Sequence, residues 1–272
     1  MTKILKAEEF INEQFVNEMG MRVRNRNIQQ RMPDQLSKYN LVYNEATGLH
    51  DCDGDIKVEQ DLVSPDGKLV VKFGVVKGNF DCRYNKLISL EGAPKKVGGD
   101  FSCSYNKLTS LKGAPQEVGG DFSCSENQLT SLAGAPQEVG EGFSCSENQL
   151  TSLAGAPQKV GGYFRCGDNQ LTSLEGSPKE IGGYFNCGYN KLTSLAGAPQ
   201  EVGEDFLCND NELISLEGAP KKVGGDFDCA NNDNLVFDEI HFYGCLPDVI
   251  VGELKAGYDC DYELAKEYYD KK

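Results

Sequence analysis

The sequence contains no tryptophan, two histidines and no long apolar run. With two histidines, a His-rich metal site is excluded. A helix that spans a bilayer needs about 20 predominantly apolar residues, so no membrane segment is predicted. Lysine and arginine number 27 against 42 aspartate and glutamate residues, which gives a net charge of −15 over 272 residues. Because surfaces that bind phosphate groups need clustered cations, this deficit argues against nucleic-acid binding.

Cysteine, by contrast, is abundant, with eleven residues. Eight of these cysteines recur at a constant interval of 21 residues: Cys82, Cys103, Cys124, Cys145, Cys166, Cys187, Cys208 and Cys229. Disulfide scaffolds of secreted proteins have irregular spacings, and zinc sites need short-range pairs such as Cys-x-x-Cys, which does not occur here. A fixed period over many copies instead predicts a protein built of stacked repeats.

One copy, residues 97–115, reads Val-Gly-Gly-Asp-Phe-Ser-Cys-Ser-Tyr-Asn-Lys-Leu-Thr-Ser-Leu-Lys-Gly-Ala-Pro. Its segment Phe-x-Cys-x-x-Asn-x-Leu-x-x-Leu resembles the core motif of the leucine-rich repeat family, particularly the short-repeat class found in bacteria and bacteriophages. The resemblance covers about residues 76–235. It implies an α/β-type repeat solenoid of mostly short parallel β-strands with an irregular convex side, a fold used chiefly to bind other proteins.

Four parts are expected along the chain. They are an N-terminal helical segment (1–50), an N-terminal cap (51–77), a leucine-rich repeat solenoid of eight 21-residue repeats (78–235) and a C-terminal cap (236–272). Apolar residues at helical spacings predict a helix over 8–20. In the C-terminal cap, Leu246-Pro247-Asp248 is expected to start a helix, and a second helix is expected over 262–271.

Each repeated residue has an expected place. On a short strand, Phe101 and Cys103 point inward, whereas Asp100, Ser102 and Ser104 point outward. The repeated asparagines should hydrogen-bond backbone groups that stacking buries: Asn85, Asn106, Asn127, Asn148, Asn169, Asn190, Asn211 and Asn232. The inward cysteines should form a column of buried, inert thiols. Disulfides are disfavoured because side chains that stack in parallel do not point at one another.

Two features near the N-terminus leave alternatives open. Asp51, Asp53 and Asp55 could suggest a calcium loop, but the positions for Gly and Glu hold Ile56 and Leu62, so a solvated turn is the better interpretation and no metal is predicted. An arginine cluster follows the first predicted helix: Arg22, Arg24, Arg26 and Arg31. This cluster could dock an acidic partner, fold back on the acidic array, or be a solvated helix end.

A candidate binding site emerges where the repeats depart from their own consensus. The outward positions carry mostly Ser and Asp, but three successive repeats break this pattern with Tyr163, Arg165, Tyr184, Asn186 and Leu207. Aromatic, arginine and apolar side chains grouped on a rigid sheet are typical of an interface hot spot, so we predict a partner-binding patch. Neutral drift of the repeats is the alternative.

A second candidate is acidic. The carboxylates along the strand exits are those of Glu126, Glu147, Asp168 and Asp210, beside Asp205 and Asp226. Such a cluster favours a partner with a basic surface and fast, salt-sensitive association. Solubility conferred by net charge is the alternative interpretation.

No catalytic motif is found, so we expect a non-enzymatic protein–protein interaction module with no cofactor, no nucleic acid and no membrane among its partners. It would bind a protein on the concave sheet, and one concrete version of this function is a phage inhibitor of a host or defence protein. The alternative is a virion-associated or assembly protein held in a larger particle by its terminal segments, and an acidic nucleic-acid mimic is a weaker third option. The first residues lack the apolar core of a signal peptide, which predicts a cytoplasmic location, in the host if phage-encoded.

Overall fold

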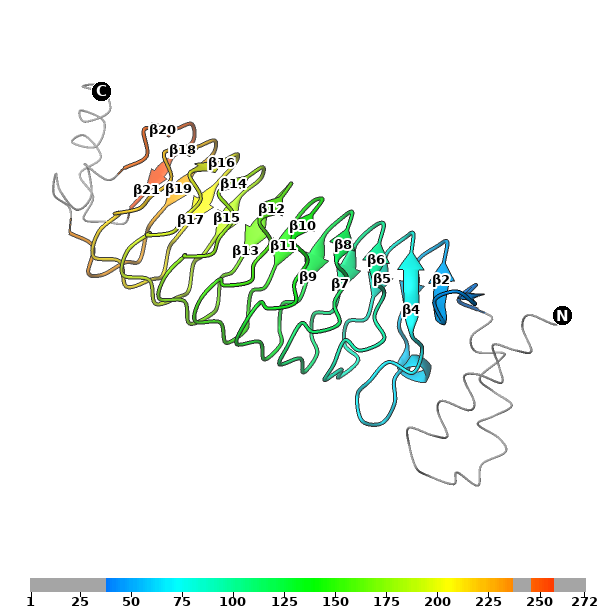
Figure 1. Cartoon of the computed structure of the whole chain (residues 1–272). Helices are drawn as coiled ribbons and strands as arrows, with labels where there is room; N and C mark the ends of the chain where they lie inside the picture. The colour runs from blue at the N-terminus through cyan, green and yellow to red at the C-terminus, as the bar shows by residue number, and fades with distance from the viewer. Residues whose placement is uncertain (1–37, 237–245, 257–272) are drawn as a thin grey trace.

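The computed structural model describes residues 38–236 and 246–256. Over these residues the chain winds into a β-solenoid, in which each coil adds one short strand to each of two sheets (Figure 1). One helical element is present in the described part, the 3-10 turn η1 (Gln60–Leu62). None of its helices is long and apolar enough to cross a membrane.

Sheet A has eleven strands. In spatial order they are β1 (Val42–Asn44), β2 (Leu49–Cys52), β4 (Phe73–Val76), β6 (Lys96–Val97), β8 (Glu117–Val118), β10 (Glu138–Val139), β12 (Lys159–Val160), β14 (Glu180–Ile181), β16 (Glu201–Val202), β18 (Lys222–Val223) and β20 (Val249–Ile250). Strand β1 pairs antiparallel with β2, and all the other pairs are parallel.

Sheet B has ten strands, all parallel. They are β3 (Ile56–Lys57), β5 (Phe80–Asp81), β7 (Phe101–Ser102), β9 (Phe122–Ser123), β11 (Phe143–Ser144), β13 (Phe164–Arg165), β15 (Phe185–Asn186), β17 (Phe206–Leu207), β19 (Phe227–Asp228) and β21 (Leu254–Lys255). Equivalent residues pair in register, so that Phe101 lies opposite Phe122, which fixes every outward residue beside its counterpart in the next coil.

The expected α/β leucine-rich repeat fold is therefore wrong. That expectation gave each repeat one strand and an irregular convex side, but each coil contributes two strands. Gly98, Gly99 and Asp100 form a corner between β6 and β7, so Val97, which is buried, belongs to a strand of its own in sheet A. The stretch that precedes β8 holds Pro115, which lacks a backbone donor and favours extended backbone over helix. The stacked repeat and the inward-facing Phe and Cys are confirmed.

The C-terminal expectation also fails in part. Leu246-Pro247-Asp248 does not start a helix; β20 and β21 follow it and continue both sheets, pairing with β18 and β19. The helices expected over 8–20 and 262–271 lie outside the described residues.

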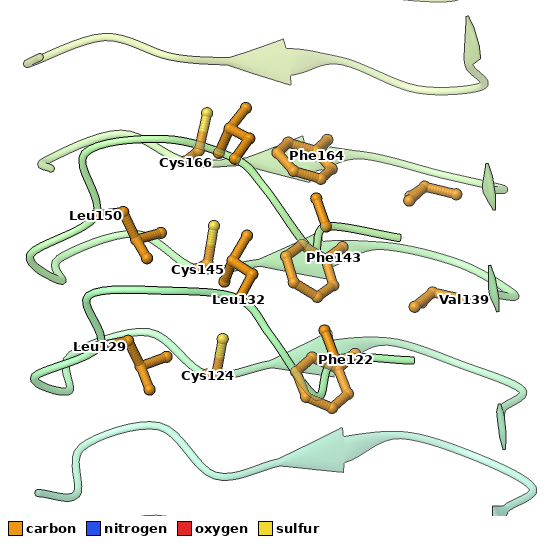
Figure 2. Close-up of a cluster of buried hydrophobic side chains, with 14 of the residues drawn as sticks. Phe122, Cys124, Leu129, Leu132, Val139, Phe143, Cys145, Leu150, Phe164 and Cys166 are labelled. Atoms are coloured by element: carbon orange, nitrogen blue, oxygen red, sulfur yellow. The ribbon is translucent and has the colours of Figure 1, made fainter. Parts of the chain in front are cut away.

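The core consists of columns of identical side chains (Figure 2). The phenylalanine rings from Phe80 to Phe227 stack coil on coil, with ring centroids 5.2–5.7 Å apart. Beside them run the cysteine column and two leucine columns, such as Leu108 and Leu111, all fully buried. Since one coil cannot enclose its own apolar side chains, the stack of coils supplies the hydrophobic stabilisation.

The nine cysteines within the described residues are buried and form no disulfide bonds. Desolvation raises the pKa of each column thiol from Cys82 to Cys208, which favours the unreactive thiol over the thiolate. Several sulfurs, including that of Cys145, lie 3.4 Å from a carbonyl oxygen of the next coil. The predicted column of buried cysteines is confirmed.

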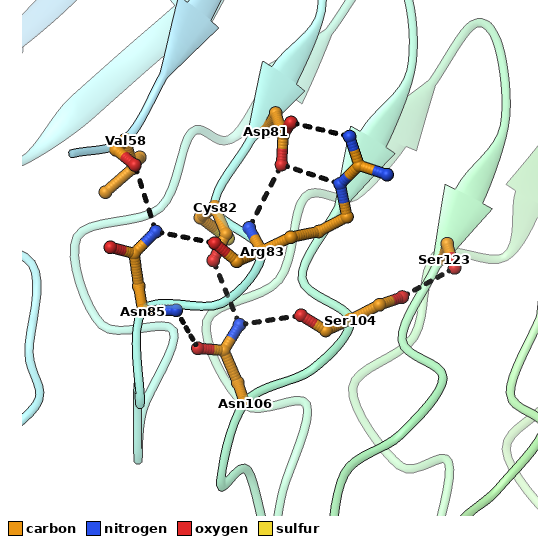
Figure 3. Close-up of polar contacts among 8 residues, drawn as sticks. All are labelled: Val58, Asp81, Cys82, Arg83, Asn85, Ser104, Asn106 and Ser123. Carbon is orange, nitrogen blue, oxygen red and sulfur yellow. Dashed lines mark hydrogen bonds and ion pairs between the residues drawn. The ribbon is translucent and has the colours of Figure 1, made fainter.

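The asparagine column is also confirmed (Figure 3). The Nδ2 group of Asn106 donates to the carbonyl oxygens of Cys82, Cys103 and Ser104, and its Oδ1 accepts from the amides of Asn85 and Leu87. Each asparagine thus satisfies backbone groups in its own coil and in the preceding coil, where water cannot reach them.

Candidate functional site

A groove of about 870 Å³ runs along the outer face of sheet B, across the coils from Asn79 to Leu207. We call it the sheet B groove. Its floor consists of the outward side chains of the strands and of the residues that follow them. Its two walls are the corner residues that precede each phenylalanine and the turn residues that follow the strand. In-register stacking makes each of these positions a column that runs the length of the groove.

The corner wall is built on aspartates. The Asp100 Oδ1 atom accepts a hydrogen bond from the backbone amide of Asp121, 2.9 Å away, and Asp121 does the same for Gly142 at 2.7 Å. Asp55, Asn79, Asp205 and Asp226 repeat this contact. Sequence reasoning missed this role, although an Asp repeated directly before the phenylalanine was the available signal.

The turn wall is a column of residues with left-handed backbone, in which φ lies between 52° and 60°. Its members are Tyr84, Tyr105, Glu126, Glu147, Asp168, Tyr189, Asp210 and Asn231. Tyr84 and Tyr105 stack with ring centroids 4.3 Å apart. Residues other than glycine uncommonly adopt this backbone conformation, and packing between the stacked coils holds these residues in it.

The floor of the first half of the groove consists of serines. Ser104 Oγ lies 2.7 Å from Ser123 Oγ, and Ser125 Oγ lies 2.7 Å from Ser144 Oγ (Figure 3 shows the first pair). These hydroxyl pairs join neighbouring coils across the floor. Ser104 lies on the outer face as expected, yet it is buried because its neighbours in the groove cover it.

The five residues of the predicted patch all line the second half of the groove. The rings of Tyr163 and Tyr184 stack with centroids 5.4 Å apart, and the guanidinium carbon of Arg165 lies 4.8 Å and 5.0 Å from their centroids. Arg165 therefore makes a cation–π contact with both rings. The structure brings these three of the five residues of the predicted patch into contact.

Asn186 and Leu207 extend the patch along the floor. In the register of β13, β15 and β17, Arg165 lies beside Asn186, and Asn186 lies beside Leu207. The Oδ1 atom of Asn186 accepts a hydrogen bond from the Gly188 amide at 2.9 Å, which fixes the side chain. Leu207 is partly exposed and gives the groove an apolar end.

Tyr163 stands where other coils have the corner aspartate. Its ring lies over Gly142, where a Cβ atom would overlap it, and its hydroxyl donates to the Asp121 Oδ2 atom at 2.9 Å. Burial, followed by this carboxylate, raises the pKa of the Tyr163 hydroxyl. The Tyr184 hydroxyl is buried and has no hydrogen-bond partner among the described residues.

The predicted acidic cluster divides between the two walls. Glu126, Glu147 and Asp168 are consecutive members of the turn column, and Asp210 follows after Tyr189. Asp205 belongs to the corner wall of the groove, whereas Asp226 lies beyond the groove and forms an ion pair with Lys255 at 2.6 Å.

The carboxylates of Asp51, Asp53 and Asp55, considered above as a calcium loop, each have a different partner. Asp51 Oδ1 accepts from the Val75 amide at 2.7 Å, Asp53 pairs with Lys77 at 2.8 Å, and Asp55 accepts from the Asn79 amide.

Elsewhere, one carboxylate oxygen each of Asp100, Asp121 and Glu141 lie within 4.8 Å of one another. Two of these three carboxylates already hold backbone amides, and exposed acidic groups cluster commonly without a cation, so no metal site is assigned.

No protein-family model, no curated protein and no solved structure gives a significant match to this chain.

Proposed function

We propose that this protein is a non-enzymatic binding module that recognises a protein partner through the sheet B groove, with Tyr163, Arg165, Tyr184, Asn186 and Leu207 as the central contact. The observation that carries the proposal is the contact of Arg165 with the stacked rings of Tyr163 and Tyr184. Tyrosine and arginine are the residue types that contribute most to binding at protein interfaces.

Pre-organisation supports the proposal. Tyr163 is held by Asp121, Tyr184 stacks on Tyr163, and Asn186 is fixed by the Gly188 amide. Side chains that are already ordered lose less conformational entropy on binding, so more of their contact energy contributes to affinity. The patch also lies on paired strands rather than on a loop, which keeps its geometry rigid.

The experiment replaces three patch residues with the residues that the serine-floored coils carry at the equivalent positions. A variant carrying Tyr163→Asp, Arg165→Ser and Tyr184→Asp gives these coils the residues that Asp100 and Ser102 show to be compatible with the fold. The full chain and the variant are used as bait in a lysate of the cells that carry the gene. The wild type should capture a partner that the variant does not.

A matched control carries Glu138→Ser, Lys159→Ser and Glu180→Ser, three exposed positions of sheet A. It should capture the partner as well as the wild type does, and all three proteins should melt within a few degrees of one another. If the consensus variant keeps its partner, the patch does not carry binding, and neutral drift of the repeats is the better account.

The particle-bound structural role stays a prediction, as do the phage origin and the cytoplasmic location. The phage origin was suggested by the resemblance to leucine-rich repeat proteins, and the structure does not have that fold. Detection of the protein in purified particles would favour the structural role.

A further inference from the structure

We propose that the first half of the sheet B groove, which comprises the coils of β5 to β11 together with Asp168, binds an extended segment of a partner protein in which lysine or arginine occupies consecutive positions. This inference rests on the proposed function, because it names the chemistry of the partner that the same groove recognises. It concerns the serine-floored, acidic half and not the aromatic patch.

Charge is the first argument. Seven carboxylates and two guanidinium groups line the groove, an excess of five negative charges. One guanidinium is already neutralised, because Arg83 pairs with Asp81 at 2.8 Å. The other, Arg165, lies over the rings of Tyr163 and Tyr184, in the same coil as Asp168. A cationic partner is therefore the complement of this surface.

The turn wall is the second argument. Glu126, Glu147 and Asp168 occupy consecutive coils, and none of them forms an ion pair within the described residues. Burial raises the pKa of Glu147, and the charges of Glu126 and Asp168 raise it further. Like charges in neighbouring coils repel, so a cation placed beside them would relieve a repulsion that the fold leaves uncompensated.

The shape of the groove is the third argument. The coils from Asp81 to Asp168 number five, and at a spacing of about 4.8 Å they span about 19 Å, the length of about six residues of extended chain. Successive side chains of an extended segment point to opposite sides. One side would face the corner wall with Asp100 and Asp121, and the other would face Glu126, Glu147 and Asp168. Because both walls are acidic, consecutive basic residues fit better than alternating ones.

The serine floor completes the site. Ser102, Ser123 and Ser146 line the groove between the two walls with hydroxyl groups that both donate and accept hydrogen bonds. Such a floor can pair with the amides and carbonyls of a bound backbone without selecting a side chain. The carboxylates of the two walls would then select for basic side chains of the bound segment.

The test measures binding of a fluorescein-labelled hexalysine peptide to the full chain by fluorescence anisotropy. The variant Glu126→Gln, Glu147→Gln, Asp168→Asn removes three charges from the turn wall, at positions where Asn and Gln keep the backbone geometry. Its dissociation constant should rise at least tenfold. The control Glu138→Gln, Glu180→Gln, Glu201→Gln removes the same charge from exposed positions of sheet A and should change it less than twofold.

Three outcomes would overturn the proposal. The two triple variants could lose affinity equally, which would mean that only net charge attracts the peptide. Trilysine could bind as tightly as hexalysine, which would mean that the groove does not recognise an extended segment. The peptide could bind only after Arg22, Arg24 and Arg26 are replaced by Ser, which would make a segment of this chain the occupant. Because all these variants keep Tyr163, Arg165 and Tyr184, each outcome is separate from failure of the partner-capture experiment.

Discussion

The Tyr163 hydroxyl donates a hydrogen bond to the Asp121 carboxylate across two coils and 42 residues of sequence, passing over Gly142. This contact joins the two halves of the sheet B groove. The contact also requires that Gly142 has no side chain. The equivalent positions of the two preceding coils hold Asp100 and Asp121. The aromatic patch and the glycine are therefore one structural unit, which makes their coupling measurable.

Gly142→Ala should destabilise the protein by about 1–3 kcal/mol, because the new methyl group overlaps the Tyr163 ring and the array cannot expand around it. The backbone at Gly142 does not have positive φ, so no strain from that source is expected. In a Tyr163→Asp background the same substitution should cost less than about 0.5 kcal/mol. A double-mutant cycle by urea unfolding measures this coupling, and additive effects would show that the contact is not formed.

The two stacked tyrosines should respond oppositely to loss of their hydroxyl groups. Tyr163→Phe removes the hydrogen bond to Asp121 and should cost about 1 kcal/mol. Tyr184→Phe removes a buried hydroxyl without a partner in the described chain, so stability should stay the same or rise by about 1 kcal/mol. Thermal unfolding of both variants tests the pair. Equal destabilisation would mean that the Tyr184 hydroxyl has a partner.

Asn148→Ala should cost about 3 kcal/mol. The Asn148 amide donates to three backbone carbonyls, at Cys124, Cys145 and Ser146, and its oxygen accepts from the Leu129 amide. Its removal leaves buried polar groups unsatisfied. The adjacent exposed Gln149→Ala is the control and should change stability by less than about 0.5 kcal/mol. A similar loss in both variants would show that the asparagine column does not carry stability.

Alkaline pH should destabilise the protein steeply. Unfolded thiols ionise near pKa 8.5, whereas burial raises the pKa of the seven column thiols from Cys82 to Cys208 in the folded state. Above about pH 8.5 the folded state binds more protons than the unfolded state, so the free energy of unfolding falls as pH rises and is unaffected below.

Each thiol contributes at most about 1.4 kcal/mol per pH unit, so the seven together give a slope of roughly 10 kcal/mol per unit. Urea midpoints under reducing conditions at pH 7.5, 8.5 and 9.5 measure it. Cys145→Ala should reduce the slope by about one seventh. A stability that does not change up to pH 9.5 would mean that the column thiols are not buried.

Much of the coil could be predicted from one copy of the repeat. The period gave the stack, and the alternation of Phe101 and Cys103 gave the inward face. A repeated Asn followed by two Leu residues gave the hydrogen-bonded turn and the rest of the core. The five patch residues could be grouped because in-register stacking turns a sequence offset of 21 residues into spatial adjacency.

The second sheet could not be predicted in the same way. Its strands, such as Lys96–Val97, are two residues long, too short to show a period, and their one buried side chain is equally compatible with a loop. The corner at Gly98 to Asp100 did not distinguish the two folds, because Phe101 begins a strand both in a leucine-rich repeat and in this β-solenoid. The Tyr163–Asp121 contact could not be predicted either, because it forms only where Gly142 has no side chain.

In-register pairing has a consequence for how such a chain can change. Removal of the 21 residues from 101 to 121 would bring Phe80 next to Phe122 and Asp81 next to Ser123, the same pairs of residue types that the intact sheet contains. This deletion keeps Gly142 beneath the Tyr163 ring and puts Asp100 in the place of Asp121. Because the copies in this region are almost identical in sequence, their coding segments are suited to unequal recombination. The reach of the groove can thus lengthen or shorten in whole coils, while the tyrosine–arginine patch at one end stays intact.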